Sequence, residues 1–155
     1  MRVTRIVPIY EPETPNAKEI YYPVWLYVFY YHVKRRVFGD IKGKFVVMVD
    51  GINGRSYLAD VFPQLEEVET DGRILEPKIT DEESRELAVD KAEAFLFRKF
   101  AYLKFSYRLE QKAFTYKLFW AMKSGESYLL LDSITGDEIE VQKIERSEQF
   151  VDDPR

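Results

Sequence analysis

The sequence contains no cysteine and a single histidine, His32, among its 155 residues. The lack of cysteine excludes disulfide scaffolds, zinc ribbons, iron–sulfur clusters and thiol nucleophiles. The single histidine excludes a metal site with several histidine ligands from one chain. We therefore expect no metal ion and no cofactor, and the sequence indicates no small-molecule substrate.

Long apolar runs and glycine-rich motifs are also lacking. The longest apolar stretch lies between Glu19 and His32 and contains Pro23, so it is too short for a helix that crosses a bilayer. The basic N-terminus is not followed by an apolar segment, and no signal peptide is expected. Neither a P-loop nor a dinucleotide-binding motif occurs, and no serine lies in a nucleophile elbow. We expect a cytoplasmic protein that is not an enzyme.

Charged side chains are abundant but unevenly distributed, with a formal net charge of −4. Residues 1–58 carry 9 basic and 5 acidic side chains, residues 59–90 carry 3 and 11, residues 91–123 carry 8 and 2, and residues 124–155 carry 3 and 9. Either the acidic and basic segments face each other in the fold, or a basic face meets an anionic partner. The many charges and few amide side chains are typical of a thermophile.

Hydrophobic periodicity predicts one helix and several strands. Thr80 and Glu83 form a capping-box signature, which begins a helix at about 81–99 that would alternatively continue to about 108. Residues 61–79 carry Pro63 and Pro77 and many carboxylates, so they predict an acidic linker. Residues 145–155 predict a frayed, charged tail. Strands are predicted at 3–10, 20–33, 44–50, 55–60, 101–110, 113–122, 127–132 and 137–144.

A short motif occurs twice, because residues 47–54 align with residues 129–136. In each copy an apolar strand ends in an aspartate, Asp50 or Asp132, and a glycine follows four positions later, Gly54 or Gly136. The aspartate can accept hydrogen bonds from amides inside the turn, and the glycine can take a positive φ. We expect these four residues to form structural turns rather than a catalytic or calcium-binding site.

The repeat predicts an α+β fold in which one main helix, at about 81–99, packs on two antiparallel β-meanders. The first meander is expected at 1–60, and the second, with the helix, at 80–144. Each contains an aromatic strand with one tryptophan, Trp25 or Trp120. The two repeats would share one compact domain or swap between subunits.

The second repeat resembles a PepSY-type domain through Trp120, the stretch from Leu131 to Gly136, and Ile139. The first repeat resembles the same meander through Trp25 and the stretch from Val49 to Gly54. It differs in having no helix before it and Asn53 in place of threonine. The resemblance implies a non-catalytic, cystatin-like module, of the kind found in regulatory segments of proteases and in extracytoplasmic proteins, and it brings no catalytic residues.

Two groups of residues are candidates for binding. The strand at 20–33 is apolar on both faces, so one face needs a cover. We interpret the chain as a non-catalytic interaction or regulatory module that binds a protein partner or a second copy as a homodimer. The residues expected to bind a partner are Tyr21, Trp25, Tyr27, Phe29 and Tyr31. The residues expected to bind an anion are Lys34, Arg35, Arg36, Arg98, Lys104 and Arg108.

Two further functions stay open. Cations alternate with aromatic residues over 98–123, and such side chains can contact phosphates and stack on bases. This segment would then bind single-stranded nucleic acid. An enzyme that uses aspartate or glutamate side chains would require a cleft holding two carboxylates of raised pKa.

Overall fold

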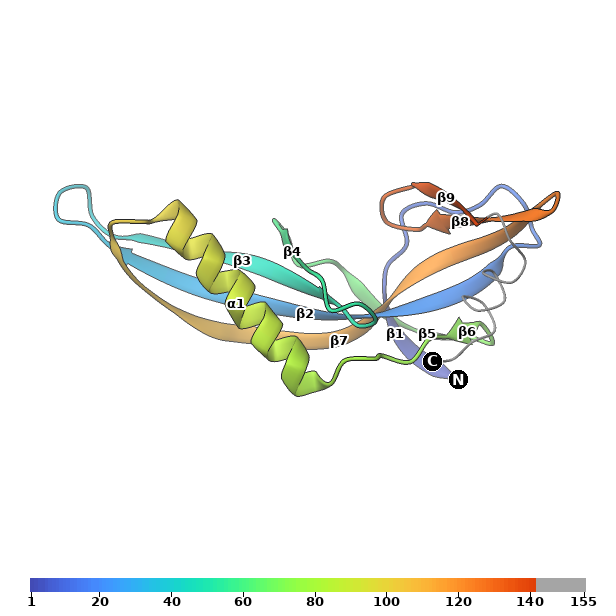
Figure 1. Cartoon of the computed structure of the whole chain (residues 1–155), viewed down its shortest axis with the longest axis horizontal. Coiled ribbons are helices and arrows are strands. Elements are labelled where there is room, and N and C mark those ends of the chain that lie inside the picture. The colour runs from blue at the N-terminus through green and yellow to red at the C-terminus, as the bar shows by residue number, and fades with distance from the viewer. Residues whose placement is uncertain (142–155) are drawn as a thin grey trace. The chain divides into compact units, whose positions relative to one another are not determined.

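The structure, a computed structural model, describes residues 1–141 (Figure 1). The described strands form one mixed nine-stranded sheet, and 52% of the described residues lie in strands and 14% in helix. The single helix of this part is α1 (Asp81–Lys99). The strands are β1 (Arg2–Ile6), β2 (Lys18–Lys34), β3 (Ile41–Asp50), β4 (Ser56–Ala59), β5 (Leu65–Glu69), β6 (Arg73–Ile74), β7 (Lys104–Ser124), β8 (Ser127–Asp132) and β9 (Glu138–Val141).

This architecture contradicts the predicted α+β fold of two meanders packed on one helix. β2, β3 and β4 are consecutive antiparallel neighbours, and so are β7, β8 and β9. However, the order β4-β3-β2-β7-β1-β5 joins them through the sheet, and β1 pairs in parallel with β7 while β6 pairs in parallel with β2. The physical reason is that β1, β5 and β6 find their partners far along the chain, which local periodicity does not reveal.

The chain divides into two compact units, and the two longest strands contribute to both. Unit 1 comprises Met1–Pro23, Pro63–Lys78 and the described residues from Thr115 to Val141. Unit 2 comprises Val24–Phe62 and Ile79–Phe114. α1 therefore belongs to the unit of β3 and β4, although it precedes β7 to β9 in the sequence.

In unit 2, α1 packs on the aromatic face of the sheet. The core contains Phe29 and Phe45 from the strands and Ala88, Ala92 and Leu96 from α1, all of which are buried. Small alanine side chains let the helix backbone approach the large rings closely. The helix begins as predicted, because Thr80 and Glu83 form both hydrogen bonds of a capping box.

In unit 1, opposite charges accompany the pairing of β1 with β5. The ladder runs from Arg2 opposite Glu69 to Ile6 opposite Leu65, and Arg5 Nε donates to Glu66 at 2.8 Å. This pairing brings a basic segment of the sequence against an acidic one. The core of this unit is formed by Val3, Tyr21 and Leu118, with Tyr116 and Trp120 packed against it.

Several predicted boundaries change in the structure. β5 and β6 lie inside the segment 61–79, for which a linker was expected. The predicted strands 101–110 and 113–122 are one strand, β7. The helix spans Asp81–Lys99 as predicted and does not continue to about 108. β7 and β8 form a hairpin whose turn contains Gly125 at φ 64°. The end of the strand predicted at 137–144 and the tail 145–155 lie outside the described residues.

Candidate functional site

The aromatic residues expected to meet a partner lie in the interior. Tyr21, Tyr27 and Phe29 are fully buried, and Trp25 and Tyr31 are 5% and 9% exposed. The last four belong to the core beneath α1, whereas Tyr21 lies in the core of unit 1. In the described structure a helix of the same chain occupies the face for which a protein partner was expected.

The two repeated turns have the hydrogen bonds expected of them. Asp50 Oδ1 accepts bonds of 2.8 and 3.0 Å from the amides two and three residues later. Asp132 Oδ1 accepts the equivalent bonds at 2.8 and 3.2 Å. Gly54 and Gly136 have φ angles of 75° and 78°, which any other residue adopts only with strain. The turn at Asp50 belongs to unit 2 and the turn at Asp132 to unit 1.

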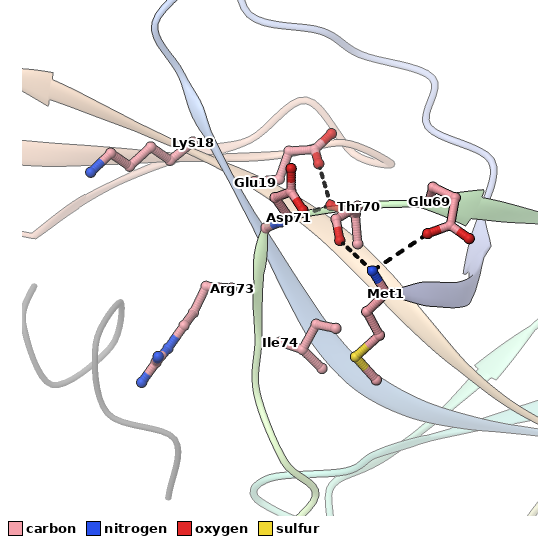
Figure 2. A pocket seen from close by; sticks show the side chains of 9 residues that line it. Met1, Lys18, Glu19, Glu69, Thr70, Asp71, Arg73 and Ile74 are labelled. Carbon is pink, nitrogen blue, oxygen red and sulfur yellow. Dashed lines mark hydrogen bonds and ion pairs between the residues drawn. The ribbon is translucent and has the colours of Figure 1, made fainter.

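Unit 1 contains an open, polar pocket of about 1080 Å³ (Figure 2). It is lined by Met1, Lys18, Glu19 and residues 69–74. Thr70 Oγ1 donates to Glu19 at 2.7 Å, and the Met1 ammonium donates to the Thr70 carbonyl at 3.1 Å and lies 3.4 Å from Glu69. In Figure 2, Lys18 and Arg73 extend away from this network.

The contacts in this pocket are those of a structural network. Burial raises the pKa of Tyr21, and its hydroxyl donates to Glu19 while accepting from Arg5. Arg5 also binds Glu66, and Glu19 is contacted by Arg5 of β1, Tyr21 of β2 and Thr70 of the β5–β6 connection. Within residues 1–141, no three histidine, aspartate or glutamate side chains are placed to hold a metal ion.

A second candidate site lies at one end of unit 2, where the β2–β3 hairpin closes. The ladder ends at Val33 opposite Ile41, so residues 34–40 project beyond it. Arg35 holds this tip together: Nε donates to the Gly39 carbonyl at 2.8 Å and Nη2 donates to the Phe38 carbonyl at 3.0 Å. Two backbone carbonyls of the tip are therefore bonded within the tip itself.

The one carboxylate of this tip is bonded back toward the strand. Asp40 Oδ2 lies 2.7 Å from His32 Nε2, and the Arg35 amide donates to Oδ1 at 3.4 Å. The hydrogen bond to His32 lowers the pKa of Asp40, and the Arg35 amide acts in the same direction. His32 thus has a structural role in this hairpin. Apart from Asp40, the exposed side chains of the tip are the cations Lys34 and Arg36 and the apolar residues Val37 and Phe38.

The end of α1 and the start of β7 lie at the same end of unit 2 (Figure 1). The rings of Tyr31, near the end of β2, and Phe100, the C-cap of α1, are 5.5 Å apart. Phe97 packs edge-on against Phe105 at 5.1 Å. We name the two segments together, residues 34–40 and 97–104, the cationic end.

Charge and exposure distinguish the cationic end from the rest of the described surface. Its 15 residues carry six cations and one carboxylate, and none of the six forms an ion pair with a described carboxylate. Five of the thirteen exposed large apolar side chains of the described chain also lie here. They are Val37 at 78%, Phe38 at 80%, Phe97 at 61%, Tyr102 at 100% and Leu103 at 40% exposure.

Most of the residues predicted to bind anions meet at this end. Lys34, Arg35, Arg36, Arg98 and Lys104 all belong to it, whereas Arg108 lies further along β7 with its guanidinium 4.6 Å from the Tyr30 ring. Sequence reasoning missed the five exposed apolar side chains. The available signal was a pair of apolar residues, Val37 and Phe38, inside a basic connection that also contains Gly39.

The segment 98–123 uses most of its aromatic residues as core. Phe105 and Tyr107 pack on the core of unit 2, and Tyr116 and Trp120 pack on that of unit 1. Two of its cations are paired, Lys112 with Asp81 and Lys117 with Asp132. The most exposed aromatic side chain of this segment, Tyr102, lies at its start, in the cationic end.

Comparison with family models, with curated proteins and with solved structures finds no significant match. The resemblance to PepSY-type domains, the homodimer and the cytoplasmic location therefore stay predictions. Within the described part of the chain, no helix combines the length and the apolar character needed to cross a bilayer.

Proposed function

We propose that this chain is a non-catalytic binding module that engages an anionic partner surface through the cationic end. One observation carries the proposal: two segments far apart in the sequence place six cations at one end of unit 2, and none is paired with a described carboxylate. In unit 1, by contrast, Arg5 is neutralised by an ion pair with Glu66. Unneutralised charge of one sign attracts a partner of the opposite sign.

The preformed geometry of the hairpin tip supports binding by this surface. Arg35 and Asp40 hold the tip internally, which leaves Lys34 and Arg36 exposed to solvent. A surface that is ordered before binding loses less conformational entropy when the partner arrives. The tip therefore fits a role in recognition better than a role as a mobile connection.

Retention on a heparin column tests the proposal, because heparin is a dense polyanion. A charge variant carries three reversals in the cationic end, Lys34→Glu, Arg36→Glu and Lys104→Glu. A control variant carries the same change of net charge elsewhere, Arg55→Glu, Lys78→Glu and Lys123→Glu. We expect the wild-type chain and the control variant to be retained and to elute with salt, and the charge variant to flow through. Equal elution of the two variants would overturn the proposal.

A further inference from the structure

Apolar side chains project from the cationic end together with its charges. Val37 and Phe38 occupy the hairpin tip, and Tyr102 and Leu103 occupy the connection between α1 and β7. Exposed apolar groups surrounded by polar ones mark a surface that binds a partner. The partner must therefore offer both negative charge and an apolar environment.

The types of these side chains distinguish between two anionic partners, single-stranded nucleic acid and a lipid bilayer. Single-stranded nucleic acid binds proteins through phosphates and through stacking of bases on aromatic rings. Val37 and Leu103 are aliphatic and have no ring on which a base can stack. The interfacial layer of a bilayer accepts aliphatic and aromatic side chains alike, and tyrosine in particular is common at that depth.

The hydrogen bonds of the tip also suit a medium with little water. A backbone carbonyl that enters such a medium needs a partner from within the protein. Arg35 supplies one to the carbonyls of Phe38 and Gly39, at 3.0 and 2.8 Å. Its guanidinium also lies over the Phe38 ring, 5.7 Å from the ring centre.

The cations are placed where lipid headgroups would meet them. Lys34 and Lys104 flank the projecting segments at the end of β2 and the start of β7. Lys99 Nζ lies 5.5 and 5.7 Å from the centres of the Phe95 and Phe100 rings, so this cation lies beside the aromatic residues at the end of α1. A basic patch beside shallowly inserted apolar groups binds anionic membranes through two signals that reinforce each other.

We propose that the cationic end docks peripherally on an anionic lipid bilayer, with Val37, Phe38, Tyr102 and Leu103 in the interfacial layer. This inference rests on the proposed function and adds the chemistry of the partner. No part of α1 or of the strands needs to enter the hydrocarbon core. Binding depends on both anionic lipid and the apolar tips, and it weakens as salt rises.

Sedimentation of the full chain with lipid vesicles tests the inference. One set contains phosphatidylcholine alone, and the other also contains about 30% phosphatidylglycerol, which gives an anionic surface. An apolar variant carries Val37→Ser, Phe38→Ser and Tyr102→Ser and keeps every charge. We expect the wild-type chain to sediment only with anionic vesicles. The apolar variant should bind them at least about tenfold more weakly while its elution from heparin is unchanged.

A fluorescence measurement adds a readout that does not depend on the stability of a triple variant. Phe38→Trp places a reporter at the tip, and Tyr57→Trp places a matched reporter on β4, where Tyr57 is 49% exposed. On anionic vesicles, the emission of the tip reporter should shift to shorter wavelength. The emission of the β4 reporter should not change.

The outcomes separate this inference from the proposed function. Equal vesicle binding by the apolar variant and the wild-type chain would refute docking through the tips. Binding of a single-stranded oligonucleotide without any binding of anionic vesicles would also refute it, while the heparin result would still support an anionic partner. If the charge variant elutes from heparin like the wild-type chain, the proposed function itself fails.

Discussion

The ion pair between Lys117 and Asp132 in unit 1 allows a quantitative test of the structure. Lys117 Nζ lies 2.5 Å from Asp132 Oδ2, and the two side chains are 21% and 10% exposed. Asp132 Oδ1 meanwhile accepts two amide bonds of its turn. Asp132→Asn keeps a turn acceptor and removes the charge, so it isolates the ion pair from the turn.

The expected cost follows from the burial of the pair. Removing one partner of a buried pair costs about 3–5 kcal/mol, whereas an exposed pair contributes about 0–1 kcal/mol. Because this pair is mostly buried, we expect Asp132→Asn to lower the free energy of unfolding by about 2–3 kcal/mol. Lys117→Met leaves the carboxylate bound to its two amides and should cost only about 1 kcal/mol. The double variant should then resemble Lys117→Met.

Urea unfolding of the four proteins, followed by circular dichroism, measures the coupling between the two residues. The double-variant cycle should give a coupling energy of about 2 kcal/mol. A cost for Asp132→Asn below about 0.5 kcal/mol would show that the pair acts as an exposed one. Simple addition of the two single costs would show that the side chains do not interact, which would refute the contact.

Two further predictions concern unit 2. Leu96→Ala removes three carbons from a fully buried side chain. Urea unfolding should therefore show a loss of about 3 kcal/mol in the free energy of unfolding. A loss below about 1 kcal/mol would contradict the packing of α1 on the sheet. Burial and the hydrogen bond to Glu93 raise the pKa of Tyr107 to about 12. Because this hydroxyl ionises at lower pH in the unfolded chain, its contribution to stability should be lost as the pH rises from about 10 to about 12. Tyr107→Phe should show a shallower loss over that range in pH-dependent urea unfolding, and an unchanged slope would be evidence against the shift.

Features determined by neighbouring residues could be predicted from the sequence. The capping box of Thr80 and Glu83 fixed the start of α1, since both of its hydrogen bonds lie within one turn. The turns at Asp50 and Asp132 depend likewise on bonds that span three residues or fewer. Each of these features is complete within a short window of the chain, so its residue pattern is sufficient.

Features determined by distant partners could not be predicted. β5 carries three glutamates in five residues, and its own sequence favours a solvated connection. It becomes a strand because β1, more than sixty positions earlier, supplies a complementary edge with Arg2 and Arg5. The parallel pairs of β1 with β7 and of β6 with β2 depend on separations of the same kind.

The pattern of β7 was interpreted as two strands because its apolar positions change parity. Phe105 and Tyr107 have odd numbers and pack on the core of unit 2, whereas Tyr116 and Leu118 have even numbers and belong to the core of unit 1. A strand with one buried face keeps one parity. Here the change of parity coincides with the boundary between Phe114 and Thr115. It marks the passage from one core to another, and the strand continues through it.

The same distinction applies to the aromatic residues of β2, which were expected to meet a partner and are buried in the described structure. The strand is apolar on both faces, which shows that it needs covers but not which element supplies them. α1, about fifty residues later, covers Tyr27 and Phe29 by placing Ala88 and Ala92 against them. Val37 and Phe38 add little to any periodic pattern, yet they are 78% and 80% exposed beside unpaired cations. For a binding surface, apolar character is informative only together with exposure, and exposure is a property of the tertiary structure.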